Sequence, residues 1–315
     1  MPCEILVTGG GGLLGRALQK LCPQALFLTS RDGDLRDIRQ TEALFEKFRP
    51  KKVLHLAAKI GGVKTNALHN ADFFADNVQI NVNVLQTAQK FGVSRLISIL
   101  SSCALPNFPD RPSTEEDLHS GMPYGGNAGY SYAKRMLELQ TRLLCEQYGV
   151  RFTTITPMTL YGPHDNWDLE EGHVAGALIH KCFLAKQAGK SFEVWGSGRA
   201  VRQFVYAPDI ARLLLELLEK EDEEPETMIA AMDEGMTIAG LARKIADAME
   251  FRGPVVFDAA KPEGELRRVL KSSRFQERFP HFHFTSFEEG LTETIQWFSD
   301  NQNQIHQPLG RIYDH

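Results

Sequence analysis

Residues 4–22 read EILVTGGGGLLGRALQKLC, and the architecture of the whole chain follows from this stretch. A run of apolar residues leads into consecutive glycines, after which apolar residues return at helical spacing. Glycines permit a tight turn, a close approach of the backbone to a diphosphate, and close packing of a helix on a strand. The stretch therefore predicts a strand, a turn and a helix whose N-terminus binds the phosphates of a dinucleotide. The residues expected to contact the dinucleotide here are Gly9, Gly12, Leu13, Leu14 and Gly15.

Short apolar runs alternate with helical stretches through the first half of the chain, which is typical of βαβ units around a parallel sheet. We expect a loop at residues 61–73. The order of elements predicts an α/β protein with a doubly wound parallel sheet, the Rossmann arrangement. Strands are expected at residues 4–10, 25–30, 51–58, 94–102 and 151–162, and helices at residues 12–22, 39–50, 77–92 and 131–149.

After Gly162 the alternation becomes irregular. Helices are expected at residues 173–190, 207–220, 236–250 and 287–302, and a strand at 190–196. The acidic residues 219–226 predict a solvated loop. We expect two units that interleave along the chain. Residues 1–160 form the dinucleotide-binding Rossmann domain, to which residues 198–232 return, and residues 161–197 and 233–315 form a smaller substrate-binding lobe.

Composition excludes several classes of protein. With 315 residues, of which 43% are hydrophobic and 24% charged, the chain can bury a large core. A formal net charge of −5 gives no basic excess for nucleic acid or an anionic membrane surface. No apolar segment approaches the roughly 18 residues of a membrane span. The five cysteines form no metal-binding CxxC pairs and there is no signal-peptide pattern, so we expect reduced thiols in a cytoplasmic protein without a metal site.

The end of the second expected strand bears on the type of dinucleotide. NAD sites commonly carry a carboxylate there for the ribose 2′-hydroxyl, whereas this strand ends with Ser30 and Arg31. A guanidinium beside a hydroxyl suits a 2′-phosphate, which favours NADP(H). The alternative is a surface arginine that pairs with Asp32. Six further residues either wall the adenine and pyrophosphate or are ordinary loop and strand-end residues: Asp34, Leu35, Ala57, Ala58, Gly61 and Gly62.

Tyr130 and Lys134 stand four residues apart in GYSYAKRMLE, so on a helix they share one face. We expect the ammonium to lower the pKa of the phenol, which would make Tyr130 an acid catalyst for a carbonyl group. Ser101, upstream in SILSSCALP, adds a hydroxyl for the carbonyl oxygen. Tyr132 lies on another side of the helix. A plain amphipathic helix with a surface lysine is the alternative, because this spacing often arises by chance.

The glycine loop, the HLAA strand end, the SSC segment and the YxxxK pair resemble the extended short-chain dehydrogenase/reductases that act on nucleotide sugars. The similarity sharpens over SSCALP, YSYAKR, LYGPHDN, EGHV, VWGSG and RQF, and it runs from Ile5 to about Trp297. The resemblance implies an enzyme that takes GDP-4-keto-6-deoxy-D-mannose. It would invert C3 and C5, since the C4 ketone acidifies both neighbouring carbons, and then reduce that ketone with NADPH.

The same resemblance assigns roles to individual residues. Cys103 would be the base and His173 the acid of both inversions, with His164 as a rival acid. Ser101 and Tyr130 would hydrogen-bond the C4 oxygen, and Tyr130 would supply the last proton. Lys134 would also bind the nicotinamide ribose, and the nicotinamide would be lined by His173, Pro157, Thr159 and Leu160.

The GDP portion would be held by Lys181, Trp195, Arg202 and Glu263. An indole can stack on a base or sugar, and an arginine can bind a diphosphate through two nitrogens. Two of these positions, and one position beside the nicotinamide, depart from the family pattern. Lys181 replaces an arginine, Glu263 an aspartate and Thr159 an asparagine, which bears on affinity more than on the type of reaction.

Two alternatives remain open at this point. The chain could be another nucleotide-sugar enzyme of the family, namely a 4-epimerase, a 4,6-dehydratase or a simple 4-ketoreductase. It could also be a non-catalytic NADP sensor, although a sensor has no need of the tyrosine and lysine. The resemblance further implies a homodimer in which the helices expected at 77–91 and 130–148 form a four-helix bundle.

Overall fold

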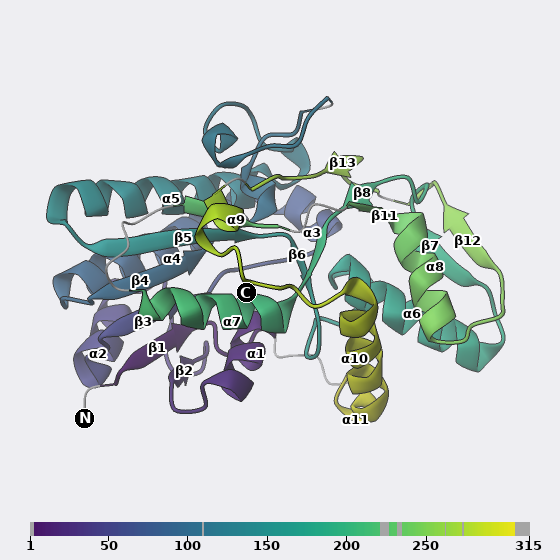
Figure 1. Cartoon of the computed structure of the whole chain (residues 1–315), viewed down its shortest axis with the longest axis horizontal. Coiled ribbons are helices and arrows are strands. Elements are labelled where there is room, and N and C mark those ends of the chain that lie inside the picture. Colours follow the sequence, from purple (N-terminus) through teal and green to yellow (C-terminus); the bar gives the residue numbers. More distant parts are fainter. Residues whose placement is uncertain are drawn as a thin grey trace.

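The glycine-rich stretch forms strand β1 (Ile5–Thr8) and helix α1 (Leu13–Leu21), joined by a short turn. The structure is a computed structural model, and it describes residues 3–108, 110–220, 227–231, 235–261, 263–272 and 274–305. The β1–turn–α1 unit is the first step of a parallel sheet that occupies the larger part of the molecule (Figure 1).

This sheet has six strands in the order β10-β5-β4-β3-β1-β2, and every neighbouring pair is parallel. Its inner strands are buried along almost their whole length, as expected for a sheet covered on both faces. The remaining strands are β2 (Leu26–Leu28), β3 (Lys52–His55), β4 (Arg95–Ile99), β5 (Arg151–Pro157) and β10 (Thr227–Ala230).

Helices cover both faces of the sheet. Helix α1 packs against α7 (Ala207–Glu219) on one face. On the other face α4 (Asn70–Lys90) packs against α2 (Ile38–Phe48) and, most extensively, α5 (Ala128–Tyr148) (Figure 1). The expected doubly wound α/β architecture is thus confirmed.

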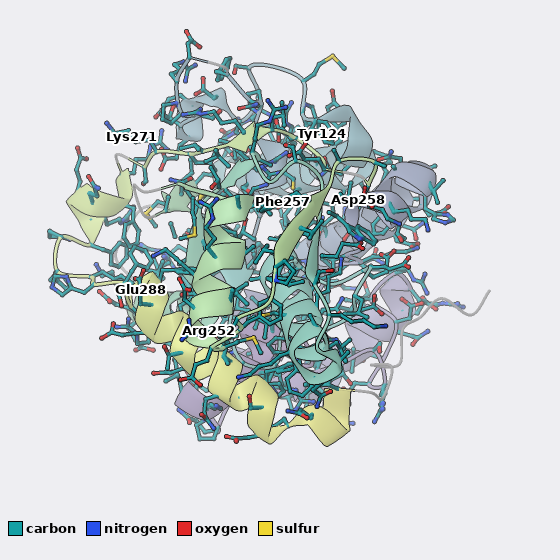
Figure 2. The ribbon with its side chains drawn as sticks, turned by 90° about the vertical axis from the view of Figure 1, so that its right-hand side faces the viewer. Tyr124, Arg252, Phe257, Asp258, Lys271 and Glu288 are labelled. Carbon is teal, nitrogen blue, oxygen red and sulfur yellow. The ribbon has the colours of Figure 1, made fainter. Side chains whose placement is uncertain are left out.

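A smaller lobe lies beside the carboxyl ends of the strands and has a separate apolar core (Figure 1). Figure 2 looks onto this lobe, with Phe257 and Asp258 of β12 near the centre of the view. Two of its strands, β7 and β12, pair with each other, and β11, β8 and β13 form a short three-stranded sheet. Its elements are α6 (Val174–Ala188), β7 (Phe192–Trp195), β8 (Val201–Arg202), β11 (Met236–Thr237), α8 (Ile238–Ala248), β12 (Val255–Asp258), β13 (Arg267–Arg268), α10 (Phe287–Asp300) and α11 (Gln302–Ile305).

Two expectations about local structure are wrong. The segment expected as a loop at 61–73 contains helix α3 (Val63–Leu68), and α4 begins at Asn70 rather than near residue 77. The sequence pattern of α3 is weak, because tertiary contacts rather than local propensity hold this helix. The strand expected at 151–162 is divided at Met158 into β5 and β6 (Thr159–Tyr161), and β6 leaves the sheet to pair with β9 (Phe204–Tyr206).

The interleaving of the two expected units has a visible basis, although the boundaries themselves stay a prediction. Within residues 198–232, α7 and β10 join the large sheet, whereas β8 lies in the small three-stranded sheet. The acidic residues 221–226, where a solvated loop is expected, lie outside the described residues, as do residues 306–315 of the expected lobe.

A buried chain of hydrogen bonds links the sheet to α4 and α5. The ring of His55 lies between Thr8, whose Oγ1 is 2.8 Å from Nδ1, and Asn81, whose Oδ1 is 3.1 Å from Nε2. The amide of Asn81 donates to the carbonyl of Ala133 at 3.3 Å. Burial, aided by the positive charge of Lys134, lowers the pKa of His55 to about 3. His55 is therefore neutral and holds β1, β3, α4 and α5 together.

The depressed pKa of His55 predicts acid sensitivity of folding. Between pH 6.5 and about 3, His55 is protonated in the unfolded chain but neutral in the folded chain. The free energy of unfolding therefore falls as pH falls. We expect urea unfolding at pH 6.5, 5.5 and 4.5 to show a steeper loss for wild type than for His55→Gln, by roughly 1 kcal/mol per pH unit. Parallel stability curves for the two proteins would contradict a neutral, buried His55.

Candidate active site

The turn between β1 and α1 is shaped for a diphosphate. Gly9 has φ +70°, and a Cβ there would lie 2.7 Å from the backbone nitrogen of Ala57. A Cβ on Gly15 would lie 2.6 Å from the carbonyl oxygen of Gly10, so helix and turn touch through backbone alone. Gly12 is the N-cap of α1 and has no side chain that could cap the helix. The first amides of the helix are therefore open to an anion. Leu13 is half-buried beside this opening, and Leu14 is anchored in the core.

The residues after β2 fit a phosphorylated ribose. Ser30 and Arg31 are exposed, and within the described residues Arg31 forms no ion pair. The carboxylate of Asp32 instead accepts hydrogen bonds from the amide and hydroxyl of Thr29, at 2.7 and 2.9 Å. The alternative in which Asp32 neutralises Arg31 is therefore not realised in this structure.

The expected adenine wall is partly committed to other contacts. Asp34 accepts hydrogen bonds from Arg36, which lower its pKa, and the two form an ion pair at 2.8 Å. The carbonyl of Leu35 accepts from the side chain of Asn83 at 2.9 Å. Ala57 and Ala58 are half-buried just beyond β3, where Ala57 meets the glycine turn. These contacts give the residues fixed positions, and their role toward adenine stays a prediction.

The structure brings together the residues expected around a ketone. Ser101 is the N-cap of a short 3-10 helix (Ser102–Ala104), and its hydroxyl accepts from the amide of Cys103 at 3.2 Å. The Ser101 hydroxyl also hydrogen-bonds the phenol of Tyr130, and the Cys103 thiol is close enough to act on Tyr130 electrostatically. Lys134 is buried on α5, and its ammonium donates to the carbonyl of Ile99 at 2.7 Å.

The expected effect of Lys134 on Tyr130 is wrong. Burial, followed by the charge of the Cys103 thiolate, raises the pKa of Tyr130 above its ordinary value, while the hydrogen bond from Ser101 only lowers it in part. The ammonium of Lys134 lies 5.7 Å from the centre of the Tyr130 ring and is directed to Ile99. Burial lowers the pKa of Lys134 to about 8. Tyr130 is therefore a neutral phenol, which suits a hydrogen-bond and proton donor.

His173 is held by a carboxylate that the sequence did not single out. His173 is the N-cap of α6, and its Nδ1 lies 2.9 Å from Oδ1 of the buried Asp165. Desolvation opposes a charge on His173, but the charge and hydrogen bond of Asp165 outweigh it and raise the pKa of His173. The only sequence signal for Asp165 is its place directly after His164, in PHD. The rival His164 packs against Trp297, with ring centres 4.4 Å apart, and burial lowers its pKa to about 4.

Arg202 is close to residues of both groups, the ketone residues and the expected nucleotide residues. Cys103 and Glu263 both act on it electrostatically, and burial lowers its pKa. Its guanidinium donates to the carbonyls of Val201 and Glu265, at 2.8 and 2.6 Å. Glu263 accepts from the hydroxyl of Ser197 at 2.5 Å, and this bond lowers the pKa of Glu263.

Lys181 and Trp195 meet on the smaller lobe. The ammonium of Lys181 lies 4.0 Å from the centre of the indole ring, and burial lowers the pKa of Lys181. Lys261, which the sequence analysis did not identify, lies 5.4 Å from the same ring. The indole N–H donates to Glu193 at 3.2 Å. Two cations thus surround one aromatic ring, a suitable surface for an anionic nucleotide.

Three residues expected beside the nicotinamide stand where the chain leaves the sheet. Pro157 ends β5, and Thr159 and Leu160 are half-buried on β6. The amide of Thr159 donates to the carbonyl of Gln203 at 3.1 Å. Their contact with the nicotinamide stays a prediction.

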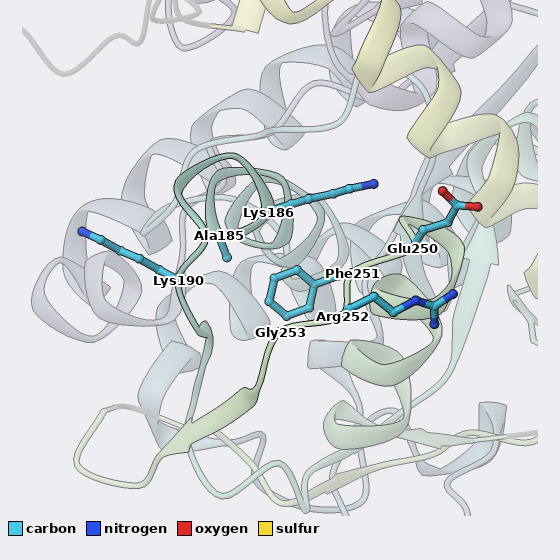
Figure 3. Close-up of a pocket in the computed structure, with 8 residues that line it drawn as sticks. Ala185, Lys186, Lys190, Glu250, Phe251, Arg252 and Gly253 are labelled. Carbon is cyan, nitrogen blue, oxygen red and sulfur yellow. The ribbon is translucent and has the colours of Figure 1, made fainter.

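Other regions offer less. A hollow of about 280 Å³ lies between the end of α6 and the segment after α8. Lys190 extends to one side of it, and Lys186 and Arg252 extend to the other (Figure 3), so its charged groups do not converge on a ligand. Within the described ranges there is no group of three or more His, Cys, Asp or Glu side chains that could hold a metal ion. None of the helices described is both long and apolar enough to cross a membrane.

Comparisons with known proteins agree with this geometry. Residues 5–231 match the NAD dependent epimerase/dehydratase family. A GDP-L-fucose synthase from Dictyostelium discoideum is 37% identical over 305 residues, which cover 94% of this chain and 95% of that protein. A GDP-L-fucose synthase from Escherichia coli (strain K12) is 33% identical over 320 residues, with 96% and 98% covered.

A solved structure gives the same result in three dimensions. The GDP-L-fucose synthetase from Naegleria fowleri bound to NADP superimposes with a TM-score of 0.87 at 40% identity, over 96% of this chain and 94% of that chain. The resemblance inferred from the sequence motifs is confirmed, including an NADP-dependent enzyme. The chain belongs to the NAD dependent epimerase/dehydratase family and, within it, to the group of the GDP-L-fucose synthases.

Proposed function

We propose that this chain converts GDP-4-keto-6-deoxy-D-mannose to GDP-L-fucose by inverting C3 and C5 and then reducing the C4 ketone with NADPH. The observation that carries this proposal is the thiol of Cys103 beside the hydrogen-bonded pair of Ser101 and Tyr130. A simple ketoreductase needs the tyrosine and serine but has no use for a thiol next to them. An enzyme that removes protons beside the ketone needs such a base.

Ser101 and Tyr130 would hold the C4 oxygen throughout. Both hydroxyls can donate to a ketone oxygen, and the same bonds strengthen when that oxygen gains negative charge as an enolate. Because the pKa of Tyr130 is raised, the phenol keeps its proton during the inversions.

Cys103 and His173 would carry the protons of each inversion. As a thiolate, Cys103 takes the proton from C3 or C5, and the electron pair of that bond moves into the enolate. His173, protonated because Asp165 raises its pKa, gives a proton to the same carbon from the opposite face. Afterwards the thiol gives its proton to solvent and His173 takes one from solvent, so both residues are ready for the second carbon.

Reduction would use the same ketone contacts. When bound, NADPH supplies the hydride for C4. Tyr130 gives its proton to the C4 oxygen, so the alkoxide becomes the alcohol. An ammonium has three N–H donors. Lys134 donates one to the carbonyl of Ile99, so two remain for a ribose hydroxyl.

The smaller lobe would bind the GDP portion. Arg202 has five N–H donors, and its two bonds to backbone carbonyls leave the others for a diphosphate. Trp195 would pack on the base or sugar, with Lys181 as a point charge and Glu263 as an acceptor.

We further propose a cytoplasmic homodimer built on α4 and α5. Met136, Leu143 and Tyr148 of α5 and Phe74 of α4 are exposed apolar side chains, which an interface would cover. Light scattering should give twice the chain mass of 35.3 kDa, and a monomer at working concentration would refute the dimer.

Removing the proposed base should stop proton exchange. In D2O, wild type should incorporate deuterium at C3 and C5 of the keto sugar, and Cys103→Ala should slow incorporation by about 100-fold or more. Reverse oxidation of GDP-L-fucose by NADP⁺ needs no base at C3 or C5, because Tyr130 takes the proton of the C4 hydroxyl, and it should persist in this variant. Exchange at the wild-type rate in Cys103→Ala would show that Cys103 is not the base.

Reversing the charge at the proposed 2′-phosphate site should change cofactor preference. We expect Arg31→Glu to raise the KM for NADPH by about 10-fold or more, because a carboxylate repels the phosphate, while the KM for NADH changes little. Steady-state kinetics with each cofactor measure the two effects. Equal changes for NADPH and NADH would remove Arg31 from the phosphate site.

A further inference from the structure

The segment expected as a loop connects two catalytic elements. Residues 61–70, called here the bridging segment, contain α3 and the first residue of α4. One end contacts the residues just before His173, and the other contacts the residue just before Tyr130. Neither contact involves a residue with a role in the proposed chemistry.

At the first end, the carboxylate of Glu171 binds the start of α3. One oxygen accepts from the amide of Gly62 at 2.9 Å, and the other accepts from the hydroxyl of Thr65. A Cβ on Gly62 would lie 3.0 Å from the carbonyl oxygen of Glu170, so the two backbones are closely packed. Glu171 stands two residues before His173, and this contact therefore fixes the entry to α6.

At the other end, Asn70 caps α5 from outside. Its Oδ1 accepts from the amide of Gly129 at 2.9 Å, whereas Asn127, the N-cap of α5, makes no side-chain cap bond. A Cβ on Gly129 would lie 1.9 Å from the carbonyl oxygen of Asn70, closer than any side chain allows. Gly129 directly precedes Tyr130, so Asn70 fixes the turn of α5 that carries the phenol.

The bridging segment is also braced internally. The side chain of the buried Asn66 donates to the carbonyls of Gly61 and Gly62, at 2.7 and 3.0 Å. These bonds fix the conformation of the end of the segment that meets Glu171.

We infer that the bridging segment is a positioning element that sets His173 relative to Tyr130. The inference rests on the proposed function, and it assigns different consequences to the two ends. Glu171 acts through His173, whose proton transfers serve the inversions alone. Asn70 acts through Tyr130, which serves both the inversions and the reduction.

Two reactions separate these consequences. Deuterium incorporation at C3 and C5 without NADPH reports the inversions, and one turnover of GDP-L-fucose with NADP⁺, read as NADPH formed, reports hydride transfer alone. We expect Glu171→Ala to slow exchange by about 10-fold or more and hydride transfer by less than about 2-fold, since small misplacements of a catalytic group are costly. Asn70→Ala should slow both reactions by similar factors.

Conservative variants serve as rescues. Glu171→Gln should keep near wild-type exchange, because its amide can accept from Gly62 and donate to the Thr65 hydroxyl. Asn70→Asp should likewise retain both reactions, because its carboxylate still accepts from Gly129. Glu170→Gln is the matched control, since Glu170 meets Lys64 at 3.7 Å with both side chains more than half exposed. Equal slowing of both reactions by Glu171→Ala, or no effect of Asn70→Ala, would overturn the inference.

Hydrogen exchange keeps this test separate from that of the proposed function. Measured by mass spectrometry, amide exchange should rise at residues 171–176 in Glu171→Ala and at residues 128–132 in Asn70→Ala. Unchanged exchange in both segments would overturn the positioning role even if the enzyme is active. Wild type that supports neither reaction would instead refute the proposed function.

Discussion

The site depends on one interaction of the buried Lys134 ammonium. Its hydrogen bond to the carbonyl of Ile99 joins α5 to the end of β4, two residues before Ser101. This bond holds the helix that carries Tyr130 next to the turn that carries Ser101 and Cys103. Burying a charge is costly, as the lowered pKa of Lys134 shows, and the neutral His55 nearby avoids adding a second charge to the same interior.

One pair of hydroxyls can serve both parts of the proposed reaction because both parts place negative charge on the same oxygen. A phenol that ionised easily would lose its proton before the inversions were complete. Burial prevents this in Tyr130, and the direction of its pKa shift thereby fits a donor that acts last. The division of labour then lies in the neighbours. In the proposed reaction Cys103 and the Asp165–His173 pair move protons at carbon, whereas Lys134 holds α5 against the end of β4.

The residues near Cys103 were identified through the family resemblance, whereas local sequence patterns were sufficient for the glycine turn and for five of the six strands of the large sheet, with β10 as the exception. Each of these depends on neighbours along the chain. They were insufficient for α3, which is held by Glu171 more than a hundred residues away, and for Asp165, whose partner His173 is joined to it only by the fold. The pKa of Tyr130 was misjudged for the same reason. Spacing placed Lys134 on the correct face, but burial decided the direction of the shift.

The structure of the product formed in D2O tests the central claim, that one site inverts two carbons before it reduces the third. Wild type would be incubated with GDP-4-keto-6-deoxy-D-mannose and NADPH, and the product analysed by nuclear magnetic resonance. The account predicts GDP-L-fucose with deuterium at C3 and C5 and a hydrogen from NADPH at C4. A sugar reduced at C4 that keeps its original configuration and hydrogens at C3 and C5 would contradict it.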